Sequence, residues 1–580
     1  MSNFRTRAKL KIGHQSRPAA TLKPIVRNVV RDSRLMLADR PANAKMHAQE
    51  ARKYTLEHLE ELHTQLRESC ERNGITYHRT ASAEEACALI SEIIGPRERI
   101  AKSKSMVAEE IGLTNYLRKQ KKEVFETDIG EYIVDIEGQG PSHVTAPAIH
   151  LDRHRIQNLL NQAGLNVPDN SPLTLSHAVR NAVSDFFQNV DVGITGANAV
   201  IASSGRIMVV ENEGNVALGL STPPIHIAVT GIEKVVQNEQ AALDIAQVLA
   251  PSATAQPLTA YTHFISTPTK NQERHLVFVD AGRTDILKDE RYREILLCIR
   301  CGACMNACPV YTAANGLSYG SPYMGPIGAV LSPLLWPENY SDLPDASSLC
   351  GRCSEVCPVG IPLHDMLLDL RADAADKKAS KKITEKIVWL SWSFIFSKPH
   401  LGQGFAWLTK KMLRLLKNLH QQTPLDPRRV PGAKRSRDTE MLIPLFEKES
   451  IPSKKENFLQ PSSLLEQFNV QATEVGFKIE NEGTARLERC LVLKATGAIA
   501  ATGSVIFVEK DPFLKKLMEA ANVTIMLEKE TIVKFPSDAE NLIGKNENAL
   551  IMTGASRTAD IEKKIVRGIH GPQNISVVIK

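Results

Sequence analysis

The chain has 580 residues, of which 43% are hydrophobic and 23% charged, and its formal net charge is +6. One hydrophobic core does not usually support this length, so two to four domains are expected. A charge of +6 spread over the whole chain does not indicate nucleic-acid binding, and neither a zinc finger nor an aromatic RNA-binding pattern accompanies it.

Residues 1–39 are predicted to form a basic N-terminal tail. Eight Lys or Arg lie within residues 1–31, and the first acidic residue is Asp32. A solvated tail, a segment that contacts an acidic surface and a transit-peptide-like leader are all compatible with this composition. The segment lacks the apolar central run of a secretory signal.

Residues 40–286 are predicted to form an α/β domain with a largely parallel sheet. Apolar residues recur at helical spacing in 54–66, 84–94, 153–163 and 174–187. Short β-like runs alternate with the helices, at 124–125, 132–134, 199–202, 207–210 and 225–229. This alternation is typical of layered α/β structures.

A cysteine-rich module follows over residues 291–371. The first run has the spacing C-x2-C-x2-C-x3-C-P and the second C-x2-C-x3-C-P, so that seven of the ten cysteines are Cys298, Cys301, Cys304, Cys308, Cys350, Cys353 and Cys357. Bacterial-type ferredoxins hold iron–sulfur clusters with such runs. The module is therefore predicted to be an α-helical, ferredoxin-like domain with two [4Fe–4S] clusters that carry electrons.

Two other interpretations of the cysteines are weaker. Disulfides would leave one of the seven sulfurs over, and nothing in the sequence suggests export. Zinc also binds C-x2-C pairs, but it closes on four ligands, and the overlapping triple run is not typical of zinc sites. The isolated Cys70, Cys87 and Cys490 are expected to behave as small hydrophobic residues, and the pattern suits a reducing cytoplasm.

In bacterial ferredoxins the last cysteine of each run binds the other cluster. Applied to this chain, this rule divides the cysteines into two sets. The first cluster takes Cys298, Cys301, Cys304 and Cys357, and the second keeps the remaining three, Cys308, Cys350 and Cys353. A full second run would have cysteine at position 347, where Ser347 stands. The second cluster is then [3Fe–4S], or a cube whose fourth iron takes Ser347, a partner's side chain, water or substrate.

The last two segments are less regular. Residues 372–463 are predicted to be a helical region followed by a linker rich in Pro and Arg. The most hydrophobic window, 387–396, is about half as long as a membrane-spanning helix, so no transmembrane segment is predicted and peripheral membrane contact stays open. Residues 470–580 return to α/β patterning, and residues 497–509 echo residues 199–211.

Several stretches together resemble the iron–sulfur subunit of the lactate-utilisation complex, over roughly residues 35–470. They are residues 102–106, 109–111, 126–128, 130–133, 141–143, 147–150, 192–198, 211–215, 224–226 and 325–328, with the cysteine runs. Residues 554–562 and 568–572 resemble the companion subunit, which carries the same domain without clusters. The chain is thus similar to a fusion of two subunits, with the second shortened.

The resemblance implies an electron-transfer subunit of a cytoplasmic complex that oxidises L-lactate to pyruvate, with other subunits as partners. It implies that the α/β domain is similar to the sugar-isomerase and coenzyme A transferase type. The chain departs from the family at Ser203-Ser204, where Glu-Thr is usual, and at Ala501-Thr502 in the second copy. The second copy also lacks its own Lys-Ser-Lys-Ser stretch and a Pro-x-His loop.

No catalytic residue is assigned from the sequence. Lys102, Ser103, Lys104 and Ser105 suit a carboxylate or phosphate, and a solvated strand end fits them equally well. For His143, His150 and His226, structural roles are favoured over acid–base or metal-binding roles, because no metal-ligand spacing accompanies them. No dinucleotide-binding or Walker motif is present.

Two alternative functions stay open. The chain could be a hydroxy-acid enzyme that uses the open iron of the three-thiolate cluster, or a redox-sensing regulatory or assembly protein.

Overall fold

The computed structural model describes residues 4–13, 19–269, 271–379, 463–480, 491–509, 513–544, 547–561, 564–567 and 569–580. The chain divides into two units, residues 1–371 with 461–580, and residues 372–460. The apolar window 387–396 and the Pro- and Arg-rich tract lie outside the described residues. None of the described helices is both long and apolar enough to cross a bilayer.

A six-stranded sheet forms the centre of the first α/β domain, and all its neighbouring strands are parallel. Its order is β1 (Ile75–Thr80), β10 (Glu273–Val279), β7 (Ile225–Gly231), β4 (Val192–Thr195), β2 (Arg99–Lys102) and β3 (Glu123–Glu126). Every residue of the central strand β7 is buried, as expected when helices cover both faces of a parallel sheet. The predicted parallel α/β architecture is confirmed.

Helices bury the two faces of this sheet in separate apolar clusters. They are α4 (Leu59–Arg72), α5 (Ala83–Ile94), α6 (Met106–Glu110), α7 (Leu113–Lys119), α8 (Ile129–Ile136), α9 (Arg153–Gln162), α10 (Pro172–Phe187) and α11 (Asn215–Ser221). Two more helices, α3 (Ala44–Glu57) and α12 (Glu239–Thr254), pack against each other. The helix predicted over 54–66 is interrupted at His58, which separates α3 from α4.

The strand predicted at residues 132–134 is wrong, because these residues belong to helix α8. Asp128 caps this helix, since its side chain accepts a hydrogen bond from the N–H of Glu131. The apolar residues Ile129 and Ile133 then fall on one buried face at helical spacing. A three-residue β-like run was too short to reveal this periodicity.

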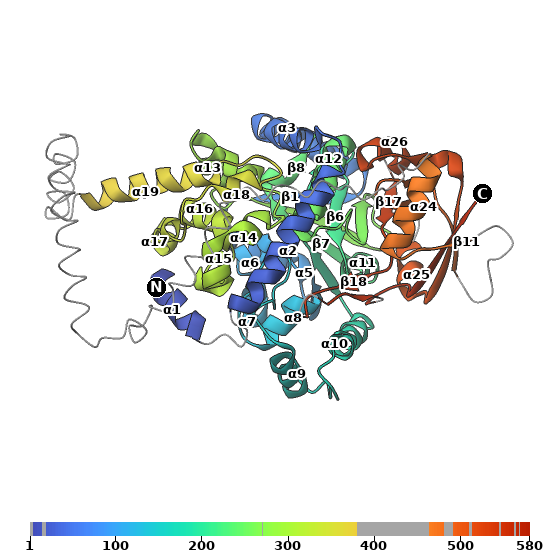
Figure 1. The fold of residues 1–580 in the computed structure, drawn as a ribbon, viewed down its shortest axis with the longest axis horizontal. Helices are drawn as coiled ribbons and strands as arrows, with labels where there is room; N and C mark the ends of the chain where they lie inside the picture. The colour runs from blue at the N-terminus through green and yellow to red at the C-terminus, as the bar shows by residue number, and fades with distance from the viewer. Residues whose placement is uncertain are drawn as a thin grey trace, which may run out of the picture. The chain divides into compact units, whose positions relative to one another are not determined.

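An eight-stranded sheet joins the first domain to the C-terminal segment (Figure 1). Its order is β16 (Ile532–Val533), β13 (Gly497–Ile499), β14 (Ser504–Glu509), β17 (Asn548–Met552), β9 (Tyr261–Ile265), β6 (Ile207–Glu211), β5 (Ala199–Ile201) and β8 (Val235–Val236). The two halves of this order mirror each other about the antiparallel pair β17–β9, in which Leu550 lies opposite His263. Each half comes from one copy of the repeat.

The internal repeat predicted from residues 199–211 and 497–509 is therefore confirmed. Strand β5 corresponds to β13, and β6 to β14. Gly205 and Gly503 occupy the same turn, both at positive φ, and a Cβ at Gly503 would lie 2.3 Å from the backbone nitrogen of Ala472. Only glycine fits such a close approach without strain.

The second copy is shortened within its parallel sheet. Its four strands are β11 (Lys478–Glu480), β20 (Asn574–Ile579), β15 (Asn522–Leu527) and β12 (Leu491–Lys494). Helices α24 (Leu464–Val475), α25 (Phe513–Glu519) and α26 (Glu540–Ile543) accompany them. This order matches β1, β10, β7 and β4 of the first copy, so counterparts of β2 and β3 are missing among the described strands. Residues 481–490 stand where the first copy has residues 81–191.

The cysteine module consists of short helices. After α13 (Arg283–Lys288), which precedes the module, they are α14 (Ala303–Ala307), α15 (Pro309–Ala314), α16 (Gly325–Leu335), α17 (Pro337–Tyr340) and α18 (Arg352–Glu355), and the longer α19 (Leu363–Ala379) follows them. The largest apolar cluster of the molecule includes module residues such as Leu297 and Ile327 together with Leu249 of α12. The module thus shares a core with the first α/β domain.

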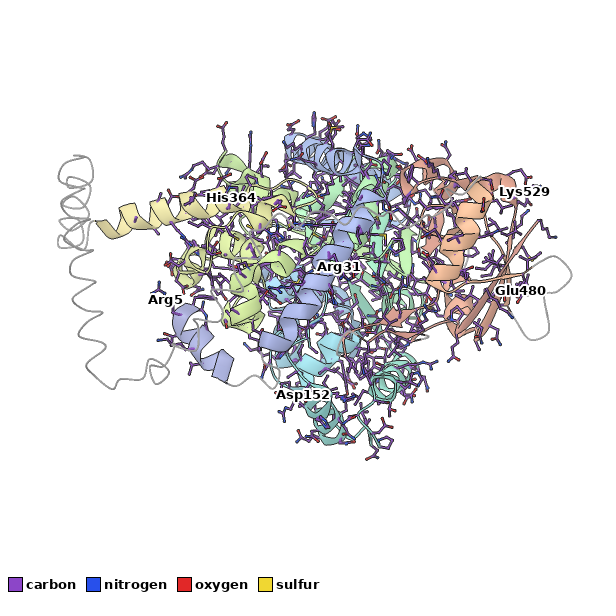
Figure 2. All side chains as sticks on the ribbon, viewed as in Figure 1. Arg5, Arg31, Asp152, His364, Glu480 and Lys529 are labelled. Atoms are coloured by element: carbon purple, nitrogen blue, oxygen red, sulfur yellow. The ribbon has the colours of Figure 1, made fainter. Side chains whose placement is uncertain are left out.

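The basic N-terminal segment is helical and packs on the module. It forms α1 (Phe4–Gly13) and α2 (Ala19–Ala38), which carry Arg5 and Arg31 (Figure 2). Arg7 donates hydrogen bonds to the carbonyl oxygens of Ser318 (3.0 Å) and Tyr319 (3.1 Å), and Arg34 pairs with Glu355 at 3.1 Å. A purely solvated tail does not describe these residues.

Candidate functional site

The cysteine loops are shaped by residues with positive φ. Gly302 and Gly351 precede helices α14 and α18 in the left-handed region, with φ of 78° and 76°. Arg300 and Leu349, which are not glycines, also have positive φ, and each immediately precedes a cysteine. Backbone of this kind turns successive side chains toward one centre.

The loops bring the cysteines into two groups. One small cavity of about 30 Å³ is lined by Cys298, Cys301, Cys304 and Cys357 together. The thiols that act electrostatically on Cys308 are those of Cys353 and Cys350. The first of these groups has the composition predicted for the first cluster, and Cys308, Cys350 and Cys353 stay the predicted ligands of the second.

The donor set fits iron–sulfur clusters rather than free thiols or disulfides. Backbone N–H groups of Arg300, Tyr311 and Ile361 point at the sulfurs of Cys298, Cys308 and Cys357, each at 3.4 Å. Burial, with smaller contributions from neighbouring thiols, raises the pKa of Cys308 to about 12 and that of Cys357 to about 11. Iron would supply the positive charge that such buried thiolates require. No disulfide joins any two cysteines that the structure describes.

Buried basic side chains lie beside the first group. Lys234 donates a hydrogen bond to the carbonyl oxygen of Cys298 at 2.5 Å, and Arg52 donates to those of Leu296 (2.8 Å) and Leu297 (3.2 Å). The guanidinium of Arg300 lies 4.4 Å from the ring centroid of Tyr323. Positive charge beside a cluster stabilises its reduced, more negative state.

An anionic residue holds these cations in place. Glu233 accepts from Nε of Arg283 at 2.8 Å and lies 3.7 Å from Arg300. Burial acts to raise the pKa of Glu233, but Arg283, Lys234 and the other nearby cations outweigh it, and the pKa is lowered to about 2. The carboxylate therefore stays ionised at neutral pH.

The second group has a different environment. The hydroxyl of Tyr319 is fully buried and has no hydrogen-bond partner among the described residues, and Cys308 is foremost among the groups acting on it electrostatically. Ser347 is half-buried, and its hydroxyl oxygen accepts from the N–H of Leu349 at 3.0 Å.

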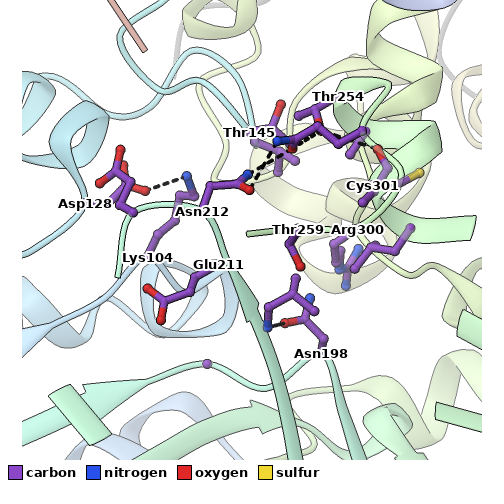
Figure 3. Close-up of a pocket in the computed structure, with 18 of the residues that line it drawn as sticks. Lys104, Asp128, Thr145, Asn198, Glu211, Asn212, Thr254, Thr259, Arg300 and Cys301 are labelled. Carbon is purple, nitrogen blue, oxygen red and sulfur yellow. Dashed lines mark hydrogen bonds and ion pairs between the residues drawn. The ribbon is translucent and has the colours of Figure 1, made fainter. Parts of the chain in front are cut away.

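A cavity of about 710 Å³ lies between the α/β domain and the first cysteine group (Figure 3). Cys301, Arg300 and Ile299 line it on the module side. Lys104 and Asp128 line it on the domain side, and their charged atoms are 2.9 Å apart. Helix α2 contributes Val26, Asn28, Val29 and Asp32. A volume of this order is typical of sites that bury an organic ligand.

Only part of the Lys-Ser-Lys-Ser stretch faces this cavity. Ser103, Lys104 and Ser105 line it. Lys102 is fully buried instead, 3.0 Å from both Glu109 and Glu126. The solvated-strand-end interpretation therefore does not hold for Lys102, and the anion-site interpretation is limited to the other three residues.

The three predicted histidines are separated. His143 lines the cavity, and its Nε2 lies 3.0 Å from Oδ1 of Asn306. Its Nδ1 accepts from the N–H of Thr145, so the proton is assigned to Nε2. Among residues lining the cavity, neither His150 nor His226 is found; His226 is fully buried, with Nε2 2.9 Å from Oγ1 of Thr195.

Sequence reasoning did not identify several polar residues of the cavity. They include Asn212 and Glu211, whose carboxylate lies 2.7 Å from Nε2 of His263. Arg557 and Asp560, from the second copy, also line it. In the sequence these two residues belong to a stretch, residues 554–562, that is indicated only by its resemblance to the companion subunit. Ser203 and Ser204, the departure from the family pattern, do not line the cavity.

Two family matches agree with this division of the chain. The LUD domain matches residues 63–286 and 491–579, more than half the chain and both copies of the repeat. The 4Fe-4S dicluster domain matches residues 294–361, which contain all seven clustered cysteines. The chain belongs to the lactate-utilisation iron–sulfur family. The module between the two matched segments is an iron–sulfur domain.

Curated relatives share much of the sequence. The chain is 40% identical to Lactate utilization protein B of Bacillus cereus (strain AH820) over 354 residues, 60% of this chain and 74% of the relative. It is 40% identical to Lactate utilization protein B of Exiguobacterium sp. (strain ATCC BAA-1283 / AT1b) over 389 residues, 65% of this chain and 83% of the relative.

A solved structure is similar at a lower level. It is a DUF162 family protein from Deinococcus radiodurans, 14% identical, with a TM-score of 0.21 over 38% of this chain and 98% of that chain. This likeness carries no conclusion about function.

Proposed function

We propose that the chain is the iron–sulfur electron-transfer subunit of a complex that oxidises L-lactate to pyruvate. Cys298, Cys301, Cys304 and Cys357 would hold one [4Fe–4S] cluster. Cys308, Cys350 and Cys353 would hold the second, which is [3Fe–4S] or has a fourth ligand other than cysteine. Other subunits of the complex and an electron acceptor would be its partners, in the cytoplasm.

The convergence of Cys298, Cys301, Cys304 and Cys357 on one small cavity carries this proposal. Oxidation of lactate releases two electrons, whereas each cluster takes up one, so two clusters in one module suit the stoichiometry. When bound, the clusters supply the one-electron chemistry. The protein's own part is to hold them, to set their potentials through nearby charges and N–H groups, and to exclude water.

The enzyme alternative requires substrate at the open iron of the three-thiolate cluster. The large cavity is lined by Cys301 of the other group, and none of Cys308, Cys350 and Cys353 lines it. This position favours electron entry at a fully ligated cluster over Lewis-acid chemistry at an open iron.

Replacing one proposed ligand tests the function. We expect Cys301→Ser to lose the first cluster, so that iron and acid-labile sulfide fall by about half, while the far-ultraviolet circular dichroism of the α/β domains is retained. Lactate-dependent reduction of the protein, followed by anaerobic EPR with the partner subunits present, should stop.

Cys87→Ser is the matched control. Cys87 is buried in α5 and its thiol donates to the carbonyl oxygen of Ile111 at 3.3 Å, a bond that serine can also make. This variant should keep its iron. Unchanged iron and electron transfer in Cys301→Ser would refute the ligand assignment and the function that rests on it.

A further inference from the structure

The connection between the last two strands of each LUD copy differs greatly in length. Residues 266–272 join β9 to β10 in the first copy, whereas residues 553–573 join β17 to β20 in the second. The longer connection contains a small hairpin of β18 (Arg557–Thr558) and β19 (Val566–Arg567). This connection of the second copy extends over the first copy.

Backbone hydrogen bonds fasten this hairpin segment to the first copy. The N–H of Arg557 donates to the carbonyl oxygen of Asn212 at 2.6 Å, and the N–H of His570 donates to that of Glu213 at 3.0 Å. Asp560 accepts from the N–H of Gly130 at 3.1 Å. A Cβ at position 130 would lie 2.7 Å from the Asp560 carboxylate, so glycine is needed there for the close approach.

The segment brings both a cation and an anion to the cavity. The side-chain amide of Gln256 is oriented so that both its oxygen and its nitrogen make hydrogen bonds. In this orientation the oxygen accepts from Nε (2.8 Å) and Nη2 (3.1 Å) of Arg557. No carboxylate of the described residues pairs with this mostly buried guanidinium. A buried guanidinium without a carboxylate partner is suited to bind one from a ligand.

The anionic side of the cavity supplies hydrogen-bond acceptors. Carboxylate oxygens of Asp128, Glu213 and Asp560 lie within 4.8 Å of one another. Burial, together with the charges of Asp128 and Asp560, raises the pKa of Glu213 well above its ordinary value. The cavity thus combines cationic groups for a carboxylate with acceptors for a hydroxyl proton.

We propose that this cavity binds a small 2-hydroxycarboxylate beside the first cluster, and that the second LUD copy completes the site with Arg557 and Asp560. The ligand's carboxylate would contact Arg557 and Lys104, and its hydroxyl would donate to a carboxylate such as Asp560. This inference rests on the proposed function, because it names the place where the electron donor binds. The second copy, which lacks counterparts of β2 and β3 among its described strands, then serves the site of the first.

Calorimetric titration of the anaerobically purified, cluster-loaded full chain tests the proposal. We expect L-lactate to bind, and propionate, which lacks the hydroxyl, to bind at least about tenfold more weakly, because a charged acceptor would lose its hydrogen-bond donor. Longer 2-hydroxy acids belong in the same titration, because the cavity has room for them. Absence of binding by lactate and by the longer 2-hydroxy acids would overturn the proposal.

Variants of the hairpin locate the site. Arg557→Gln should weaken lactate binding at least about tenfold, and Arg557→Lys should restore part of it. Asp560→Asn should reduce the preference for lactate over propionate. Arg567→Gln is the matched control, because Arg567 is the exposed residue opposite Arg557 in the hairpin and does not line the cavity. Equal lactate binding by Arg557→Gln and Arg567→Gln would overturn the proposal.

A second variant covers the case in which Arg557→Gln fails to fold. Ala559 lines the cavity, and Ala559→Phe should block lactate binding by filling space without removing a charge. Normal lactate binding by a folded Ala559→Phe protein would count against the site. Iron and sulfide measured on the same samples separate the proposed binding site from the proposed function. If the clusters are intact and these variants bind lactate normally, the binding site alone is refuted. If the clusters are missing, the proposed function is refuted.

Discussion

Buried charge at single residues connects the α/β domain to the cysteine module. Arg283 lies between two carboxylates, with Nη1 at 2.7 Å from Glu110 and Nε at 2.8 Å from Glu233. Glu233 in turn lies near Arg300 and Lys234, whose charges are beside the first cysteine group. Removing one partner of such a network leaves another charge buried and uncompensated. Replacing any one of these residues is therefore expected to destabilise the fold.

Arg300→Gln should lower the reduction potential of the first cluster. The variant removes a buried positive charge from the loop between Cys298 and Cys301. A loss of about 1.4 kcal/mol of charge stabilisation corresponds to a shift of about 59 mV for a one-electron couple. A redox titration followed by EPR measures this shift.

Arg291→Gln is its control, since Arg291 is an exposed arginine of the same module, 3.0 Å from Asp289. It should leave both potentials unchanged. A first-cluster potential that is the same in Arg300→Gln as in the unmodified protein would contradict the electrostatic account of this loop.

His63 gives the stability a specific pH dependence. Its ring lies between Oη of Tyr77 and the carbonyl oxygen of Ile232, each at 2.9 Å. Burial lowers the pKa of His63 to about 4, although the bond to Ile232 acts in the opposite direction. The unfolded chain therefore takes up this proton first as the pH falls. The contribution of neutral His63 to the free energy of unfolding is complete above about pH 6.5 and is lost progressively down to about pH 4.

Urea unfolding of the unmodified chain and of His63→Gln at several pH values tests this dependence. Between pH 7 and pH 4 the unmodified chain should lose about 3 kcal/mol of its free energy of unfolding relative to His63→Gln. Cluster loss at acid pH affects both proteins alike. A difference that stays constant across this range would contradict the assignment to His63.

Among the secondary-structure elements, the antiparallel strands β9 and β17 connect the two copies of the repeat by backbone hydrogen bonds. The pair lies at the centre of the eight-stranded sheet, with Tyr261 opposite Met552 and Phe264 opposite Ala549. Each of these two strands also pairs with a strand of its own copy on its other side. The two copies therefore share one continuous hydrogen-bonded sheet.

Leu550→Pro should break this joint. Proline removes a backbone donor from a central strand, so the ladder of the sheet loses a hydrogen bond. Leu550→Ala is the matched control, because it truncates the same buried side chain but keeps the N–H group. Chemical unfolding should show a larger loss of stability for the proline variant, and equal losses in the two variants would argue against a structural joint at β17.

How far the sequence predicts this structure depends on how local each signal is. The seven candidate ligands are predicted from spacing alone, because ferredoxin-type ligation is encoded within a few residues. The parallel sheet followed from alternating helix and strand patterns. Tyr132 was assigned to a strand because its short apolar run concealed the helical period that the Asp128 cap sets. Asp560 could not be placed beside Gly130, because no local pattern encodes a contact over 430 positions.

The described part of the chain combines an iron–sulfur module with two copies of a structural repeat of unequal size. The first copy shares a core with the module and places Lys104 in the cavity. The second copy contributes its long connection, residues 553–573, to the lining of the same cavity. This arrangement accounts for the long connection in a copy whose own sheet is reduced. It also places ligand binding, as proposed, on the side of the cluster that faces the α/β domain.

The most direct test is the metal and sulfide content of the anaerobically purified chain, followed by EPR after reduction. The account predicts brown protein with about seven to eight iron atoms per chain, a similar amount of acid-labile sulfide and signals from two clusters. Colourless protein that contains zinc and no acid-labile sulfide would contradict it.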